Sequence, residues 1–125
     1  MNYRVNLNRD EVHHLIVEKK FDQMLKYDQL MARMQPGGPL FGFREALIRF
    51  APTYKYDPGT NIYDSSEKMR VPSWTDRVLY KGDNIRPLYY DRGEIDISDH
   101  KPVKCLFEAI LSSPADINNP IDIVE

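Results

Sequence analysis

The sequence predicts an α/β fold, part of an α/β sandwich in which helices pack on sheets and long loops gather at one end. Three observations support this prediction. Residues 9 to about 34 have the pattern of amphipathic helices, later stretches have the pattern of short strands, and a long loop-like segment separates them. The chain has 125 residues, of which 42% are hydrophobic, so we expect one small domain with a modest core.

The helical region begins near residue 9. Asn8, with Glu11 three residues later, resembles a capping box in which Asn replaces the usual Ser or Thr. Val12, Leu15 and Ile16 then form the stripe of an amphipathic helix. A second helical piece is expected up to the Pro-Gly-Gly-Pro at 36–39, with four apolar residues on it: Phe21, Met24, Leu25 and Leu30.

Short strands are expected at 46–50, 77–80, 85–90 and 103–110, with a tight turn at 81–84. Residues 51–74 are rich in turn formers and aromatic residues, so an ordered loop is expected rather than a linker. Residues 112–125 contain two prolines and no Lys or Arg, and we expect a tail, linker or frayed end outside a domain at 1–111. The four strands would leave an edge or a face uncovered, so the chain looks incomplete.

Composition excludes several classes of function. The net charge of -2 argues against bulk binding to nucleic acid. One cysteine cannot form an internal disulfide, and no apolar run approaches the roughly 20 residues that span a bilayer. We therefore expect a cytoplasmic protein that is peripheral to membranes.

The first candidate for chemistry is the pair Asp99 and His100, just before the strand expected at 103–110. A histidine can donate a hydrogen bond to a phosphate oxygen, and Asp76 is a candidate to fix its tautomer. Taken alone, an Asp–His pair more often has a structural or incidental role. No zinc-ligand spacing, P-loop or nucleophile elbow is present.

The second candidate is a set of cations interleaved with aromatic residues. Lys55 lies between Tyr54 and Tyr56, and Lys68 and Arg70 follow after a loop. Such a set can bind a phosphate, because Arg offers two parallel donors and Tyr a hydroxyl. The pattern alone fits equally well a loop with solvated surface charges. Three other cations are expected on solvated faces: Lys26, Arg33 and Lys101.

Four motifs in order carry a resemblance to a known family. They are Asn-Tyr-Arg-Val at 2–5, Pro-Thr-Tyr-Lys-Tyr-Asp at 52–57, Glu-Lys-Met-Arg-Val-Pro-Ser-Trp-Thr-Asp-Arg at 67–77 and Ser-Asp-His-Lys-Pro-Val at 98–103. The chain resembles the C-terminal half of an inositol polyphosphate 5-phosphatase domain, in a synaptojanin-like branch. The resemblance implies a DNase I-like four-layer α/β sandwich. It also implies Mg²⁺-dependent hydrolysis of the 5-phosphate of phosphoinositides such as PtdIns(4,5)P2, or of soluble inositol phosphates.

The resemblance also implies roles for individual residues. Asn2 would contact the scissile phosphate or the attacking water, Asp76 would orient His100, and Asp99 would lie beside the metal or the nucleophile. His100 would stabilise the phosphate in the transition state. The inositol 4-phosphate would be bound by four residues: Tyr54, Lys55, Lys68 and Arg70. Apart from Asp99, the metal ligands are expected upstream of Met1.

The chain departs from the family pattern at its start. Met1 stands where the family has a Leu, so the Asp that precedes the matching Asn2 by two positions lies outside the chain. The N-terminal half would be missing too, and an apolar sheet face should be exposed without it. The sequence therefore predicts a part of a phosphoinositide 5-phosphatase that is inactive alone. The alternative is a non-catalytic or degenerate fragment that at most binds inositol phosphates. A sibling nuclease is disfavoured, because the cation set is specific to inositides.

Overall fold

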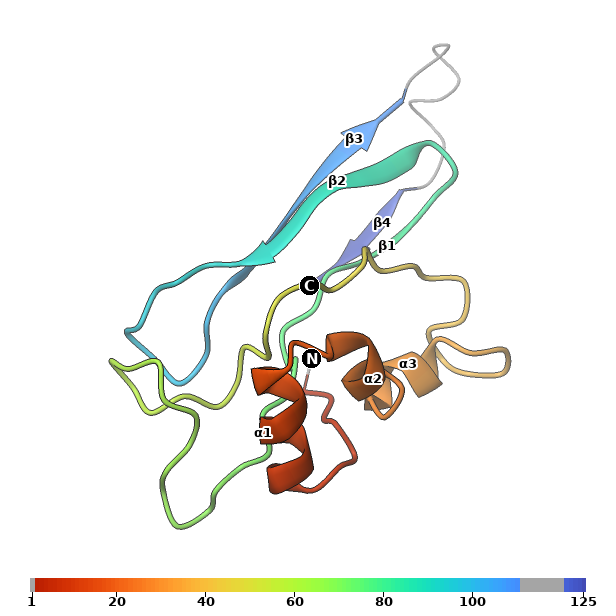
Figure 1. The fold of residues 1–125 in the computed structure, drawn as a ribbon. Helices are drawn as coiled ribbons and strands as arrows, with labels where there is room; N and C mark the ends of the chain where they lie inside the picture. The colour runs from red at the N-terminus through yellow and green to blue at the C-terminus, as the bar shows by residue number, and fades with distance from the viewer. Residues whose placement is uncertain (1, 111–120) are drawn as a thin grey trace.

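The computed structural model describes residues 2–110 and 121–125 (Figure 1). Three helices come first: α1 (Arg9–Val17), α2 (Phe21–Leu25) and α3 (Gln29–Arg33). They are followed by β1 (Leu79–Lys81), β2 (Ile85–Arg92), β3 (Val103–Ala109) and β4 (Asp122–Val124). Long irregular segments connect them, and the β2–β3 pair extends away from the helices. In the described part of the chain, no helix is long and apolar enough to cross a membrane.

The helical region begins as predicted but is more broken than predicted. The Asn8 side chain accepts a hydrogen bond from the Glu11 backbone N–H at 2.9 Å and so caps α1. Lys19, with a φ of 56°, reverses the chain after α1. The second helical piece was expected to be continuous but consists of two short helices. The reason is Asp28, whose extended backbone and side-chain bond to the Met31 N–H begin α3 anew.

Two antiparallel strand pairs form the described sheets. β2 pairs with β3, with Ile85 opposite Ala109 and Arg92 opposite Val103, and this confirms the strands predicted at 85–90 and 103–110. β1 pairs with β4 over 79–81 and 122–124. The apolar side chains that the β2–β3 pair leaves exposed include Leu88 and Leu106, so part of its surface is uncovered, as predicted.

Two predictions of secondary structure are wrong. Residues 46–50 do not form a strand, although Ile48 and Phe50 are buried while Leu47 and Arg49 are exposed. Such alternation requires only extended backbone, whereas a strand also needs a paired neighbour. In the described part, the nearby pairing is an isolated bridge between Arg44 and Tyr80. The expectation of a frayed tail is wrong for 122–124, because β1 supplies a partner strand there. The rest of the tail up to residue 120 lies outside the described residues.

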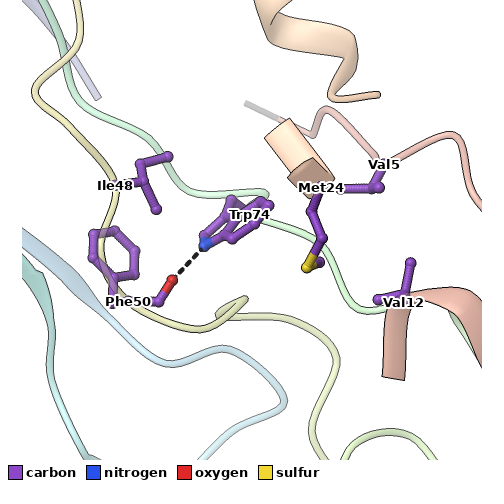
Figure 2. Packing of buried hydrophobic residues seen from close by; sticks show 6 residues of the cluster. All are labelled: Val5, Val12, Met24, Ile48, Phe50 and Trp74. Carbon is purple, nitrogen blue, oxygen red and sulfur yellow. Dashed lines mark hydrogen bonds between the residues drawn. The ribbon is translucent and has the colours of Figure 1, made fainter. Parts of the chain in front are cut away.

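A small core surrounds Trp74, the one tryptophan of the chain. Its members are Val5, Val12, Met24, Ile48, Phe50 and Trp74 (Figure 2). Trp74 is fully buried, and its indole N–H donates to the Phe50 carbonyl at 3.0 Å. Because Trp74 lies two residues before Asp76, the core fixes the loop that carries this carboxylate.

A buried ionic network lies directly behind the same loop. The Arg77 guanidinium donates to both carboxylate oxygens of Glu45 at 2.7 Å and to Asp28 Oδ1 at 2.8 Å. Tyr90 on β2 donates its hydroxyl to Glu45 Oε2 at 2.7 Å and accepts the Val78 N–H at 3.1 Å. Burial opposes the charge on Arg77, but the two carboxylates outweigh it and raise its pKa. The network connects α3, the extended segment near residue 45, the loop and β2.

Candidate functional site

Three motifs that are distant in sequence lie side by side through backbone hydrogen bonds. Tyr54 and Ser73 exchange two N–H to carbonyl bonds, at 2.8 and 3.2 Å. On the other side, the Lys101 N–H donates to the Thr53 carbonyl at 2.8 Å. The segment around residue 54 therefore lies between the segments that carry Asp76 and His100, and the backbone positions all three.

Asp76 and His100 are in direct contact. His100 Nδ1 lies 2.5 Å from Asp76 Oδ2. The hydroxyl of Thr75, which is fully buried, lies 3.3 Å from each of these atoms. A proton on Nδ1 satisfies the carboxylate, so Nε2 remains for a ligand. About 40% of both side chains is exposed, so a ligand can reach the pair from solvent.

Aromatic and cationic groups lie over this pair. The ring centroids of Tyr54 and His100 are 4.6 Å apart, and the planes are tilted by 43°. The Arg4 guanidinium carbon lies 4.4 Å from the Tyr54 ring centroid, within the range of a cation–π contact. Sequence reasoning included Arg4 in a motif but assigned it no role, and its place beside Tyr54 could not be read from spacing.

Asp99 lies on the other side of the imidazole, with its Oδ1 3.9 Å from His100 Nε2. Among residues 2–110 and 121–125, no three or more His, Cys, Asp or Glu side chains are arranged to hold a metal ion. Asp99 offers one carboxylate, which is too few ligands for a divalent cation. The described residues thus do not form a metal site by themselves.

The cation set is only partly assembled around one carboxylate. Asp64 is fully buried, and its Oδ2 lies 3.7 Å from Lys55 Nζ and accepts the Arg70 N–H at 2.8 Å. The side chains of Lys68 and Arg70 are exposed. Burial alone would raise the pKa of Asp64, but hydrogen bonds from Ser66 and Arg70 and the charge of Lys55 hold it well below its usual range. Sequence reasoning did not single out Asp64.

Asn2 is not brought to the pair. It lines a separate hollow with residues that include Lys26, Tyr27 and Arg33. The hollow at the pair is not lined by Asn2, and the role of Asn2 stays a prediction.

Lys101 is buried, and the prediction of a solvated side chain is wrong. Only 1% of its side chain is exposed, its ammonium pairs with Asp96, and Glu94 Oε2 lies 3.6 Å away. The ammonium also lies 4.7 Å from the Tyr56 ring centroid. Lys101 follows His100 in extended backbone, where successive side chains point to opposite faces. In the sequence, the sign that Lys101 could be buried was the presence of two acidic residues nearby, Glu94 and Asp96.

A hollow of about 960 Å³ runs from the pair along β3 to β4. Its lining is polar at Asp76 and His100 and apolar at Val103, Phe107 and Ile123. Ile97, which is 87% exposed, lies on its rim. The candidate site therefore opens onto an uncovered apolar surface.

Comparison with known proteins places these residues in a family. Residues 1–106 match the model of endonuclease/exonuclease/phosphatase family 2. Polyphosphatidylinositol phosphatase INP53 of Saccharomyces cerevisiae is 48% identical over 112 residues, which are 87% of this chain and 10% of that protein. The chain thus spans about a tenth of the length of this relative.

Two solved structures are similar. One is the inositol polyphosphate 5-phosphatase domain of SPsynaptojanin in complex with inositol (1,4)-bisphosphate and a calcium ion, with a TM-score of 0.77 and 40% identity. The match covers 86% of this chain and 33% of that one. The other is the ferrous NO complex of Cimex nitrophorin, with a TM-score of 0.79, 34% identity, and coverage of 87% and 39%. The fold is therefore the DNase I-like fold, and the chain belongs to the endonuclease/exonuclease/phosphatase family, in its inositol polyphosphate 5-phosphatase branch.

Proposed function

We propose that this chain is the part of a phosphoinositide 5-phosphatase domain that contributes His100 and the 4-phosphate site, and that the rest of the domain is needed for turnover. The observation that carries the proposal is the backbone ladder around Tyr54. It holds the Asp76–His100 pair beside Tyr54, the residue before Lys55, and we infer that one ligand with two phosphates reaches both the pair and Lys55. The names of the similar proteins support a phosphoinositide or inositol phosphate as the substrate.

In this proposal His100 acts on the phosphate that is cleaved. Asp76 accepts the hydrogen bond from Nδ1–H, and when the ring is in its imidazolium form Nε2 also carries a proton that it can donate in a hydrogen bond to a phosphate oxygen. Water attacks phosphorus and gives up a proton to a base supplied by the rest of the domain, while the bond from phosphorus to the inositol oxygen breaks and that oxygen takes up a proton and leaves as a hydroxyl. Negative charge accumulates on the phosphate oxygens in the transition state. The hydrogen bond from Nε2 strengthens as that charge grows, which lowers the barrier. Asn2 would orient the water or the phosphate once the domain is complete.

The cation set binds the phosphate that is not cleaved. Lys55 and Arg70 supply charge, Lys68 extends the exposed cationic surface, and the Tyr54 hydroxyl can donate a hydrogen bond. A substrate bound there would have its 5-phosphate directed to His100. We propose the headgroup of PtdIns(4,5)P2 as this substrate, met by a cytoplasmic protein at the membrane surface.

A divalent cation, Mg²⁺ in this proposal, would neutralise phosphate charge when bound. The residues described here do not fit a complete site, since Asp99 is one carboxylate beside His100. Its main ligands would come from the rest of the domain. That part would also cover the apolar hollow beside β3.

The second candidate is a non-catalytic chain that binds inositol phosphates only. Two observations favour it: the described residues lack a metal site, and one similar structure is a nitrophorin. The discriminating experiment measures Mg²⁺-dependent phosphate release from a short-chain PtdIns(4,5)P2. It compares this chain with a version that holds the whole domain.

We expect release only from the longer version, and its loss with His100→Ala. His14→Ala is the matched control, because the His14 side chain is 73% exposed on α1, away from the pair. Release that survives His100→Ala would contradict the proposed role of His100. A folded longer version with no release at all would favour the binding-only candidate.

A further inference from the structure

We propose that Asp64 is the positioning residue of the phosphate-binding cation set: it orients Lys55 and Arg70 without touching the ligand. The inference rests on the proposed function, because it assumes that these cations bind a phosphate. Asp64 lies among the cations that would bind the phosphate but is itself negatively charged. It would repel a phosphate, so it cannot be a phosphate ligand. Its contacts show what it does instead.

The carboxylate of Asp64 accepts hydrogen bonds from the loop that carries the second cationic segment. Its Oδ1 accepts the Ser66 N–H at 2.9 Å, and its Oδ2 accepts the Arg70 N–H at 2.8 Å. Both bonds are charge-assisted, and the side chain is fully buried. Residues 65–70 are all exposed and belong to no helix or strand. Ser65 also bonds to Asp57, and the Met69 N–H to the Ser66 carbonyl, but the Arg70 N–H itself bonds to Asp64.

The main chain of Asp64 fixes the first cationic segment and α1. Its N–H donates to the Lys55 carbonyl at 2.8 Å, and its carbonyl accepts from the Arg9 side chain at 2.8 Å. Through backbone and side chain together, one residue joins three parts of the chain that are distant in sequence. The separation between Lys55 and Arg70 is then defined. Two side chains on separate loops need such a fixed separation to bind one phosphate together.

The distance to Lys55 also matters. Asp64 Oδ2 lies 3.7 Å from Lys55 Nζ, which is an ion pair but is longer than a hydrogen bond. Asp64 therefore attracts the ammonium while leaving its donors for a ligand. A phosphate bound here could accept hydrogen bonds from the Lys55 ammonium, because the Asp64 carboxylate does not accept them.

An amide cannot replace this carboxylate. Asn has one acceptor oxygen, so in Asp64→Asn the amino group would face the N–H of Ser66 or Arg70, and two donors would meet. The segment 65–70 should then move while the core around Trp74 stays in place. Asp22→Asn is the matched control, because Asp22 is exposed on α2.

The experiment measures, for the wild-type chain and both variants, the dissociation constants of inositol 1,4-bisphosphate and inositol 1-phosphate. We expect the wild type and Asp22→Asn to prefer the bisphosphate, and Asp64→Asn to lose about tenfold or more of that preference. Affinity for the monophosphate should stay unchanged. An equal loss for both ligands would mean a merely structural role and would overturn the inference.

Two further outcomes separate this inference from the proposed function. If the wild type has no preference for the bisphosphate, the proposed 4-phosphate site fails and the inference falls with it. If the preference survives in Asp64→Asn, only the inference fails. Should Asp64→Asn not fold, amide hydrogen exchange of the wild type decides. The Ser66 and Arg70 amides should exchange more slowly than those of Glu67 and Lys68, and equal rates would overturn the inference.

Discussion

Replacing Arg77 by Met should remove a large part of the stability of this chain. Arg77 has no exposed surface and is the positive partner of two buried carboxylates, Glu45 with 2% and Asp28 with 0% of the side chain exposed. Met fills a similar volume, so packing changes little, but both carboxylates lose their counter-charge. Removing one partner of a buried ion pair costs about 3–5 kcal/mol, because the remaining charge stays desolvated. Domains of this kind have a total stability of roughly 5–15 kcal/mol.

The assay is urea unfolding followed by the fluorescence of Trp74, which is buried beside the network. With a slope of about 2 kcal/mol per molar urea, a loss of about 4 kcal/mol lowers the midpoint by about 2 M. Arg86→Met is the control, since the side chain in its pair with Glu108 is 64% exposed. The control should cost less than about 1 kcal/mol. If Arg77→Met costs no more than Arg86→Met, the buried network does not hold the fold together.

Two further predictions concern the pH dependence of stability and the hydroxyl of Tyr90. Because the folded pKa of Asp64 lies below its usual value of about 4, its ionised form stabilises the fold above that pH. The stability is lost as the pH falls below it, so the difference in unfolding free energy between wild type and Asp64→Asn should be largest at about pH 6 and shrink below about pH 4. Tyr90→Phe should cost about 1–3 kcal/mol in urea unfolding, because the Val78 N–H and Glu45 each lose a buried partner. Tyr89→Phe, an exposed neighbour, should change the midpoint little, and equal effects would contradict the role given to the Tyr90 hydroxyl.

Much of the fold could be predicted where local pattern and tertiary structure agree. The Asn8 cap and strands β2 and β3 follow from residue types at short spacing. Residues 46–50 show why this fails elsewhere. Their alternation of apolar side chains records burial on one side, but a strand also needs a partner, and no local pattern reports whether one exists. The same holds in reverse for β4, whose partner β1 lies far earlier in the chain.

The candidate site could be predicted as a set of motifs but not as an arrangement. The motifs named Asp76 as the candidate to orient His100, and the two are in contact. Spacing could not show that Tyr54 contacts His100, or that Lys101 turns inward while its neighbour His100 stays half exposed. A lysine is almost never fully buried unless it is paired, so the burial of Lys101 depends on its ion pairs with Glu94 and Asp96.

The residues that matter most to the site and were missed are buried acids: Asp64, Glu45 and Asp28. In a sequence each looks like an ordinary surface charge, because nothing local says that an arginine or a row of backbone N–H groups will enclose it. Their common property is that each accepts at least two hydrogen bonds: Asp64 accepts them from the backbone of its own loop, Asp28 from the Met31 N–H and from Arg77, and Glu45 from Arg77 and Tyr90. An acid in that position is costly unless every bond is made, so it constrains the loops around it more tightly than an apolar residue would. A site that must present cations and a histidine at fixed separation on irregular loops can obtain its rigidity from such acids, since it has few helices and strands to supply it.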